Sequence, residues 1–181
     1  MTKLSAAVVR IFSTMALLLG LAGCMGVPEG TEPVKGFDLE PYLGKWYEIA
    51  RLDHSFERGM SNVTAEYSLR EDGGVRVINR GYLEKDDKWK EAEGTAYFVD
   101  DTSVGKLKVS FFGPFYGAYN VIALDKEAYQ WSLVAGPDTK FLWILSRTPE
   151  LDKPILDQLL KQAESYGVEV ENLIFVDHSI Q

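Results

Sequence analysis

Short runs of alternating apolar and polar residues fill most of this chain, and they constrain its fold more than any other feature. Turn residues separate the runs, among them Asp72-Gly73-Gly74 and Gly136-Pro137-Asp138. Alternation is typical of half-buried strands, and links of hairpin length join neighbouring strands in antiparallel order. The eight runs are 44–54, 62–70, 75–84, 89–99, 106–112, 115–124, 129–135 and 141–147. They predict a mainly β fold, either an eight-stranded antiparallel up-and-down β-barrel or a sandwich.

The period of the pattern changes after Pro149. Apolar residues recur at helical spacing through residues 155–166, with Asp152 as the expected N-cap and Gly167 as the stop. A short last strand is expected at 173–176. Because this helix has a single apolar stripe, we expect it to pack against the outside of the sheet.

Residues 1–23 have the pattern of an export signal. Lys3 and Arg10 form a basic head, and residues 11–21 are an apolar run of 11 residues. A membrane-spanning helix needs about 20 residues, so this run is too short to be one. Small residues then precede Cys24, which is the only cysteine in the chain. The arrangement resembles the bacterial lipoprotein signal, which implies lipidation of Cys24 as the mature N-terminus.

Residues 24–41 contain scattered glycine and proline, so they predict a flexible tether behind the lipidated cysteine, followed by a domain at 42–178. Residue 25 is Met rather than Asp. By the sorting rule of the lipoproteins that this signal resembles, we expect a lipid-anchored protein of the outer membrane that faces the periplasm. Each buried CH₂ of an acyl chain contributes roughly 0.8 kcal/mol, so several chains form a durable anchor.

Charge and composition exclude several classes of function. The net charge of −8 argues against nucleic acid as a partner and against membrane adhesion through a basic patch. His54 and His178 have no metal-ligand spacing, so we expect them to be solvent-facing or capping residues. We expect no metal and no cofactor. Glu48, on an apolar strand, is expected to pair locally near the barrel end or to be a buried polar anchor. No nucleophile elbow, phosphate loop or dinucleotide fingerprint is present, so we expect no catalytic residue and no enzyme.

Three motifs carry a family resemblance. They are Gly44-Lys45-Trp46 in the first run, Tyr119 to Asp125 in the sixth, and Arg147 at the end of the eighth. In this order, followed by a helix, they resemble the lipocalin family over residues 37–178. The chain is similar to the bacterial outer-membrane members of that family through three further phrases, at 56–59, 110–117 and 145–149.

This resemblance selects the barrel over the sandwich and implies a function. It implies binding of fatty acids or lysophospholipids, for lipid storage, salvage or transport in the cell envelope, and pairing into a homodimer. It also assigns Trp46 and Arg147 to a pair that closes one end of the barrel. An arginine over a tryptophan ring contributes about 0.5–2 kcal/mol, depending on how dry the contact is. We expect this pair to be structural.

Alternation then predicts which side chains line the cavity. If Arg147 points inward at the closed end, every second residue before it shares its face, whereas Ile144 and Leu142 point outward beneath the helix. Small or apolar residues mark the inner face of the other strands. The expected ligand-binding wall comprises Gly94, Ala96, Phe98, Leu107, Val109, Phe111, Tyr119, Val121, Phe141, Trp143 and Leu145.

An apolar channel closed at one end selects a chain-like ligand, whose carboxylate or phosphate head would stay near the open mouth, within reach of hydroxyls or a lysine. Two alternatives remain. The first is a structural or interaction lipoprotein of the envelope whose barrel is packed solid. The second is a lipid-modifying enzyme.

Overall fold

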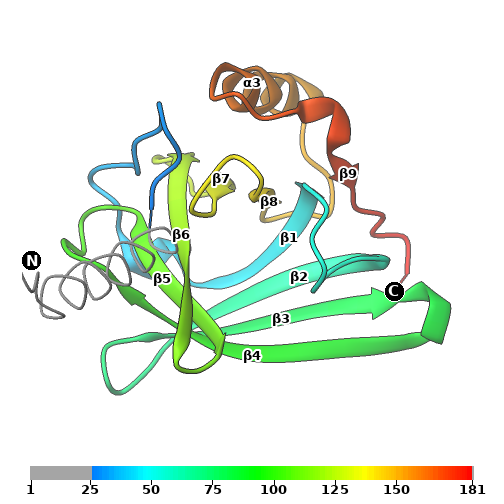
Figure 1. Ribbon diagram of the computed structural model, residues 1–181, viewed down its shortest axis with the longest axis horizontal. Coiled ribbons are helices and arrows are strands. Elements are labelled where there is room, and N and C mark those ends of the chain that lie inside the picture. Colours follow the sequence, from blue (N-terminus) through cyan, green and yellow to red (C-terminus); the bar gives the residue numbers. More distant parts are fainter. Residues whose placement is uncertain (1–25, 181) are drawn as a thin grey trace, which may run out of the picture.

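The computed structural model describes residues 26–180, which form one antiparallel barrel with a helix on its outside (Figure 1). The strands are β1 (Gly44–Arg51), β2 (Met60–Leu69), β3 (Val75–Leu83), β4 (Lys88–Phe98), β5 (Lys106–Phe112), β6 (Phe115–Leu124), β7 (Trp131–Ala135), β8 (Leu142–Ser146) and β9 (Ile174–Phe175). Each of the first seven pairs with the next, and β1 pairs with both β2 and β8, which closes the ring; β9 pairs with β1 outside it. The predicted up-and-down barrel and the last short strand are confirmed.

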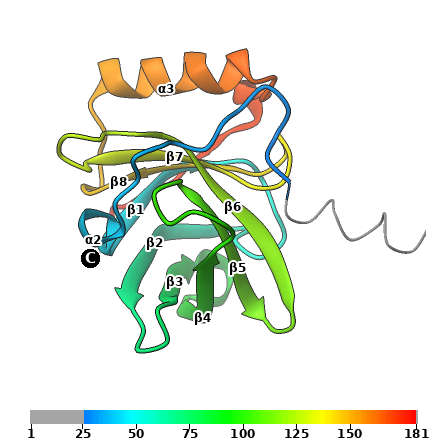
Figure 2. The same ribbon diagram turned by 90° about the vertical axis from the view of Figure 1, so that its left-hand side faces the viewer.

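The helical segments are α2 (Leu39–Tyr42), α3 (Lys153–Ser165) and two 3₁₀ turns, η2 (Glu84–Asp86) and η3 (Val170–Asn172). Asp152 is the N-cap residue of α3, as predicted. Just after the helix, Gly167 has a φ of 80°, a left-handed conformation that glycine adopts without strain. Figure 2 shows α3 lying across the outside of the barrel over β7 and β8.

Alternation along the strands divides the apolar side chains into two cores. One fills the barrel interior around Trp46, Val121 and Leu145. The other lies between the barrel wall and α3, and includes Leu142 and Ile144. The predicted outward direction of these last two residues is therefore confirmed.

Antiparallel order places alternate connections at the same end of the barrel. The closed end holds α2 and the connections at 70–74, 99–105 and 125–130. The open end holds the connections at 52–59, 84–87, 113–114 and 136–141. These two names are used below.

The segment at 26–41 packs against the barrel, which differs from the expected flexible tether. The Val34 N–H donates to Val121 O at 2.8 Å, and the Gly105 N–H donates to Val34 O at 2.8 Å. Phe37 is buried in the interior core. Glycine and proline content alone predicted mobility, but these backbone bonds and one aromatic ring hold the segment in place.

The predicted signal peptide and Cys24 lie outside the described residues. Within 26–180, no helix combines the length and the apolarity that crossing a membrane requires.

Candidate functional site

The closed end is sealed by the pair that the sequence predicted. Trp46 is fully buried, and the guanidinium carbon of Arg147 lies 3.8 Å from the centroid of its ring. Arg147 also donates to three backbone carbonyl groups, those of Pro41, Lys45 and Tyr129. These bonds join α2, β1 and the β6–β7 connection over the indole, so the contact acts as a floor for the barrel.

A chain of hydroxyl groups lies directly above this floor. The Tyr119 hydroxyl shares hydrogen bonds with the hydroxyls of Tyr42 at 2.8 Å and Tyr67 at 2.9 Å. Tyr42 also shares one with Ser132 Oγ at 3.2 Å. Burial raises the pKa of Tyr42 to about 12 and raises the pKa of Tyr67 and Tyr119 well above the usual value. The hydroxyls therefore stay neutral and satisfy one another. Sequence reasoning missed this network, apart from the inward direction of Tyr119.

The predicted cavity wall does lie in the interior. Four of its residues are buried in the inner core, namely Ala96, Leu107, Val121 and Leu145. Five more are partly buried against that core, namely Phe98, Val109, Phe111, Tyr119 and Trp143. Gly94 faces Phe111, because a Cβ built on it would meet that ring at 2.8 Å. The ring of Phe141 is stacked 6.4 Å from that of Trp143.

Exposure of the inner face increases from the closed end to the open end. On β5, Leu107 is buried, whereas Val109 and Phe111 are partly exposed. On β8, Leu145 is buried, whereas Trp143 is partly exposed. The inner face is therefore tightly packed at the closed end and more exposed toward the open end.

A buried polar cluster interrupts the apolar wall near β1. It consists of Glu48, Arg51, His54 and Glu57, and we call it the Arg51 cluster. Arg51 Nη1 donates to Glu48 Oε1 at 2.7 Å, with both side chains almost fully buried. In the pairing with β8, Arg51 lies opposite Trp143 and Glu48 lies opposite Leu145, so both face inward. A shift in register between Glu48 and Ala50 makes this possible. Without it, Glu48 and Arg51 would face opposite sides of the strand, because they are three positions apart.

The other half of the Arg51 cluster comes from the β1–β2 connection. His54 Nε2 lies 2.9 Å from Glu57 Oε2, and Trp143 Nε1 donates to the same oxygen at 3.2 Å. Arg51 Nη2 donates to Glu57 O at 2.9 Å. His54 is only 5% exposed, so its predicted solvent-facing position is wrong. Carboxylates and aromatic rings hold it inside, a tertiary environment that its sequence neighbours do not indicate.

The carboxyl groups of Glu48 and Glu57 both lie near the Arg51 guanidinium, which contacts Glu48 directly, and their pKa values move in opposite directions. Burial, followed by the charge of Glu57, raises the pKa of Glu48 well above its usual value, against the opposing effect of Arg51. Burial also opposes ionisation of Glu57, but contact with His54, the Trp143 hydrogen bond and Arg51 together lower its pKa. Of the two, Glu57 therefore ionises at lower pH than Glu48. The two expectations for Glu48 are both met, since it is buried and paired locally.

His178 shows the capping behaviour expected of it. Its Nε2 lies 2.8 Å from the backbone oxygen of Glu48. Within the described part of the chain, no group of three or more His, Cys, Asp or Glu side chains is placed to hold a metal ion.

Lys90 lies at the mouth on the inner face. Its partner in the pairing of β3 with β4 is Gly81, and the pairs Asn79–Ala92 and Val77–Gly94 follow in the same alternation. Positions 90, 92 and 94 therefore share one face of the strand. Because Lys90 and Ala92 are exposed, this face reaches solvent at the open end.

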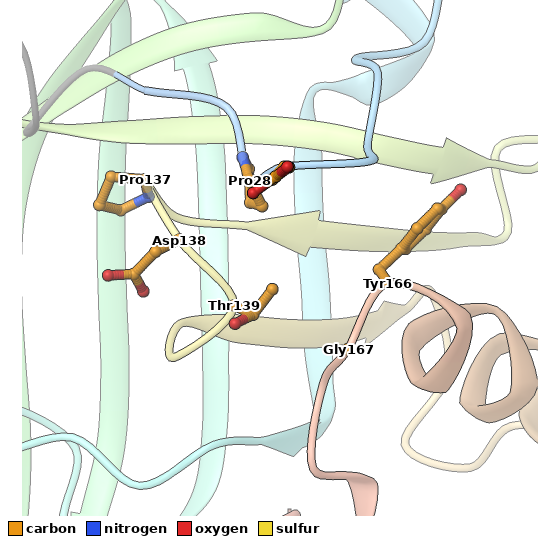
Figure 3. A pocket seen from close by; sticks show the side chains of 7 residues that line it. Pro28, Pro137, Asp138, Thr139, Tyr166 and Gly167 are labelled. Atoms are coloured by element: carbon orange, nitrogen blue, oxygen red, sulfur yellow. The ribbon is translucent and has the colours of Figure 1, made fainter.

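A separate groove of about 450 Å³ lies outside the barrel (Figure 3). It runs between the start of the described chain, the β7–β8 connection and the end of α3. It is lined by Pro28, Glu29, Pro137, Asp138, Thr139, Tyr166 and Gly167. None of the predicted wall residues lines it.

Comparison with known proteins matches residues 37–178 to the family described as the lipocalin-like domain. The chain is 57% identical over 156 residues to the outer membrane lipoprotein Blc of Vibrio cholerae, covering 86% of this chain and 91% of that protein. It is 51% identical over 164 residues to the outer membrane lipoprotein Blc of Escherichia coli K12, covering 91% and 92%. Among solved structures it is similar to insecticyanin from the tobacco hornworm Manduca sexta, with a TM-score of 0.69, 27% identity and coverage of 85% and 87%.

Proposed function

This chain belongs to the lipocalin-like family, and relatives that it matches over most of its length are named outer membrane lipoproteins. We propose that it too is a lipoprotein of the outer membrane and that its barrel binds one fatty acid or lysophospholipid. The bound lipid would be stored, salvaged or transported within the cell envelope. The observation that carries the proposal is the inner wall, which is apolar, sealed at Trp46 and increasingly exposed toward the opposite end.

The energetics of an acyl chain suit this wall. Burying about 15 methylenes releases at most about 12 kcal/mol. Immobilising the ligand and ordering the side chains around it cost several kcal/mol, which leaves an affinity between micromolar and nanomolar. Such an affinity suits a carrier, which must also release its ligand.

The polar groups of the interior favour one orientation of the ligand. The tyrosine hydroxyls at the closed end already bond to one another, so they offer a closed polar network to the tail rather than a site for a charge. Lys90 at the mouth is an exposed cation on the inner face. An anionic carboxylate or phosphate would therefore lie near Lys90, with the acyl chain pointing toward the floor.

Titration with cis-parinaric acid, whose emission rises in apolar surroundings, tests the proposal. We expect saturable binding of one molecule per chain. Val109→Trp places a large ring on the inner face of β5 and should weaken binding at least about tenfold, since it displaces ligand volume. Lys108→Trp, the matched control on the outer face of the same strand, should bind as the unaltered protein does.

An absence of saturable binding, together with no lipid adduct in native mass spectrometry, would favour the alternative of a packed barrel with a structural role. We propose no catalytic activity. The buried tyrosine hydroxyls of the interior share hydrogen bonds with one another rather than with a base that would activate one of them as a nucleophile.

We also propose that Cys24 carries the lipid anchor. Cys24→Ser should move the protein from the membrane fraction to the soluble fraction of the periplasm. Persistence of this variant in the membrane fraction would contradict the anchor.

A further inference from the structure

Three exposed phenylalanine rings surround the open end of the barrel. Phe112 and Phe115 are each 79% exposed, and Phe56 is 56% exposed. Phe56 lies in the β1–β2 connection, and the other two flank the turn between β5 and β6. We call these three residues the mouth rim. Large apolar side chains exposed on the connections of one end point to a surface that contacts an apolar partner.

The β5–β6 hairpin is also free of charge. Residues 109–124 contain no Asp, Glu, Lys or Arg, although a quarter of the chain's residues are charged. Along β5, Phe111 packs against the inner core, whereas Phe112 at the tip is exposed. The tip can therefore enter an apolar medium without carrying a charge into it.

The described chain begins on the side of the barrel that carries this hairpin. Asn120 Nδ2 donates to Gly26 O at 3.0 Å and also to Gly136 O at 3.0 Å. Gly136 directly follows β7 and belongs to a connection of the open end. Figure 2 shows the first described residues, in dark blue, and the tip of the β5–β6 hairpin on the same side of the barrel. In Figure 3, Pro28 and Pro137 of that same connection line one groove.

The covalent link to the anchor is short. Cys24 precedes Gly26 by two residues, and a fully extended chain spans at most about 3.6 Å per residue, or roughly 7 Å in all. A lipid on Cys24 therefore holds the bilayer surface close to Gly26. This step rests on the proposed lipidation of Cys24.

We propose that the open end of the barrel faces the membrane in which Cys24 is anchored, and that the mouth rim enters the interface of that bilayer. The start of the described chain and the uncharged aromatic hairpin lie on one side of the molecule, and a lipid surface is the partner that fits both the hairpin and the proposed anchor. A ligand can then pass between the leaflet and the barrel without crossing open water.

Fluorescence quenching by brominated lipid tests the orientation. The full lipidated protein is placed in phosphatidylcholine vesicles with and without bromine on the acyl chains, and a tryptophan is added by Phe115→Trp. Leu69→Trp is the matched control, because Leu69 is an apolar side chain that is 59% exposed at the closed end. We expect bromine to quench the added emission of Phe115→Trp at least about twofold more than that of Leu69→Trp, since only the former ring lies in the interface.

Two outcomes would overturn the proposal. Equal bromine quenching of the two variants would show that the mouth does not face the lipid. Protection of Phe115→Trp from aqueous acrylamide without bromine quenching would show that the rim contacts protein, such as a second copy of this chain. Phe112→Trp repeats the measurement at the neighbouring rim position.

The same samples separate this inference from the function on which it rests. Retention on the vesicles reports the anchor, and parinaric acid titration reports the ligand site. Ligand binding by an anchored protein without bromine quenching overturns only the orientation. Bromine quenching without ligand binding overturns only the carrier function.

Discussion

The two ends of this barrel are built from the same strands but differ in almost every physical respect. At the closed end, Trp46 is fully buried and Arg147 bonds three backbone carbonyl groups from separate elements. At the open end, inner-face side chains such as Val109 and Phe111 are partly exposed and Phe115 lies in solvent. The free energy of folding is thus concentrated at one end, which leaves the other end free to admit a ligand.

The contrast is not simply one of apolar against polar residues. The open end holds the Arg51 cluster, whose ion pair and hydrogen bonds fix the β1–β2 connection to the wall beside Trp143. A polar cluster of this kind tolerates nearby water better than a dry aromatic plug does. The following substitutions test whether stability and binding are divided between the ends in this way.

The largest effect is expected at the floor. Trp46→Ala should lower the free energy of unfolding by about 3–5 kcal/mol, because it removes a buried indole and the surface that Arg147 covers. Trp89→Ala removes an outward-facing ring that is 40% exposed and should cost less than about 1 kcal/mol. Chemical denaturation measures both. A loss below about 1 kcal/mol for Trp46→Ala would mean that the floor does not carry the stability.

Loss of Arg51 comes next. Arg51→Met leaves the buried Glu48 carboxyl without its cation and the backbone oxygen of Glu57 without a donor, and should cost about 3 kcal/mol at neutral pH. The loss should be smaller near pH 4, because Glu48, whose pKa is raised, can take up a proton there. Arg58→Met, which breaks the solvent-exposed pair with Asp53, is the control and should change the stability far less than Arg51→Met does. Equal losses for the two variants in urea denaturation would contradict a structural role for the cluster.

A smaller, pH-dependent effect is expected at Glu48. Since its pKa is raised in the folded state, its contribution to stability is fully present below the usual value of 4.5 and is lost as the pH rises through the folded pKa. Glu57 has a lowered pKa and therefore acts in the opposite direction, losing its contribution as the pH falls below 4.5.

Glu48→Gln should remove the first of these slopes. Relative to the unaltered protein, the variant should gain stability as the pH rises from 4.5, by about 1.4 kcal/mol for each unit by which folding raises the pKa. Unfolding curves at several pH values between 4 and 8 measure the difference. Parallel pH profiles for the two proteins would show that folding leaves the pKa of Glu48 unchanged.

The smallest effect is expected at the mouth, and it concerns binding rather than folding. Lys90→Glu reverses a charge where the anionic head is proposed to lie, so parinaric acid affinity should fall roughly three- to tenfold, with little change in stability. Lys161→Glu makes the same change on the exposed face of α3 and should leave affinity unaltered. Identical affinities for these variants would place the head group elsewhere.

The sequence predicted the fold well, and particular residues show why. Alternation is a local property, so the strand limits, the cap at Asp152 and the inward direction of Leu107 and Val109 could all be read from neighbouring residues. The contact between Trp46 and Arg147 came from the family resemblance, since these residues are far apart in the chain and alternation alone does not join them.

Other features escaped sequence reasoning because they depend on distant strands. Alternation from Glu48 places Arg51 outside the barrel, and only the register shift against β8 turns it inward. His54 is buried because Glu57 and Trp143 surround it. The segment at 26–41 is held by bonds to Val121 and Gly105, which no composition rule indicates.

By itself, then, the sequence determined that this chain forms antiparallel strands with one apolar face and a helix outside them, because period and turn chemistry act over a few residues. The family resemblance of its motifs selected the closed ring over a sandwich. The tertiary structure alone decided where charged side chains, those of the Arg51 cluster, lie among the apolar residues of the inner wall. It also decided on which side of the barrel the segment at 26–41 packs. A bulge forms, or a segment docks, only when partners that are far apart in sequence supply its hydrogen bonds and cover its side chains.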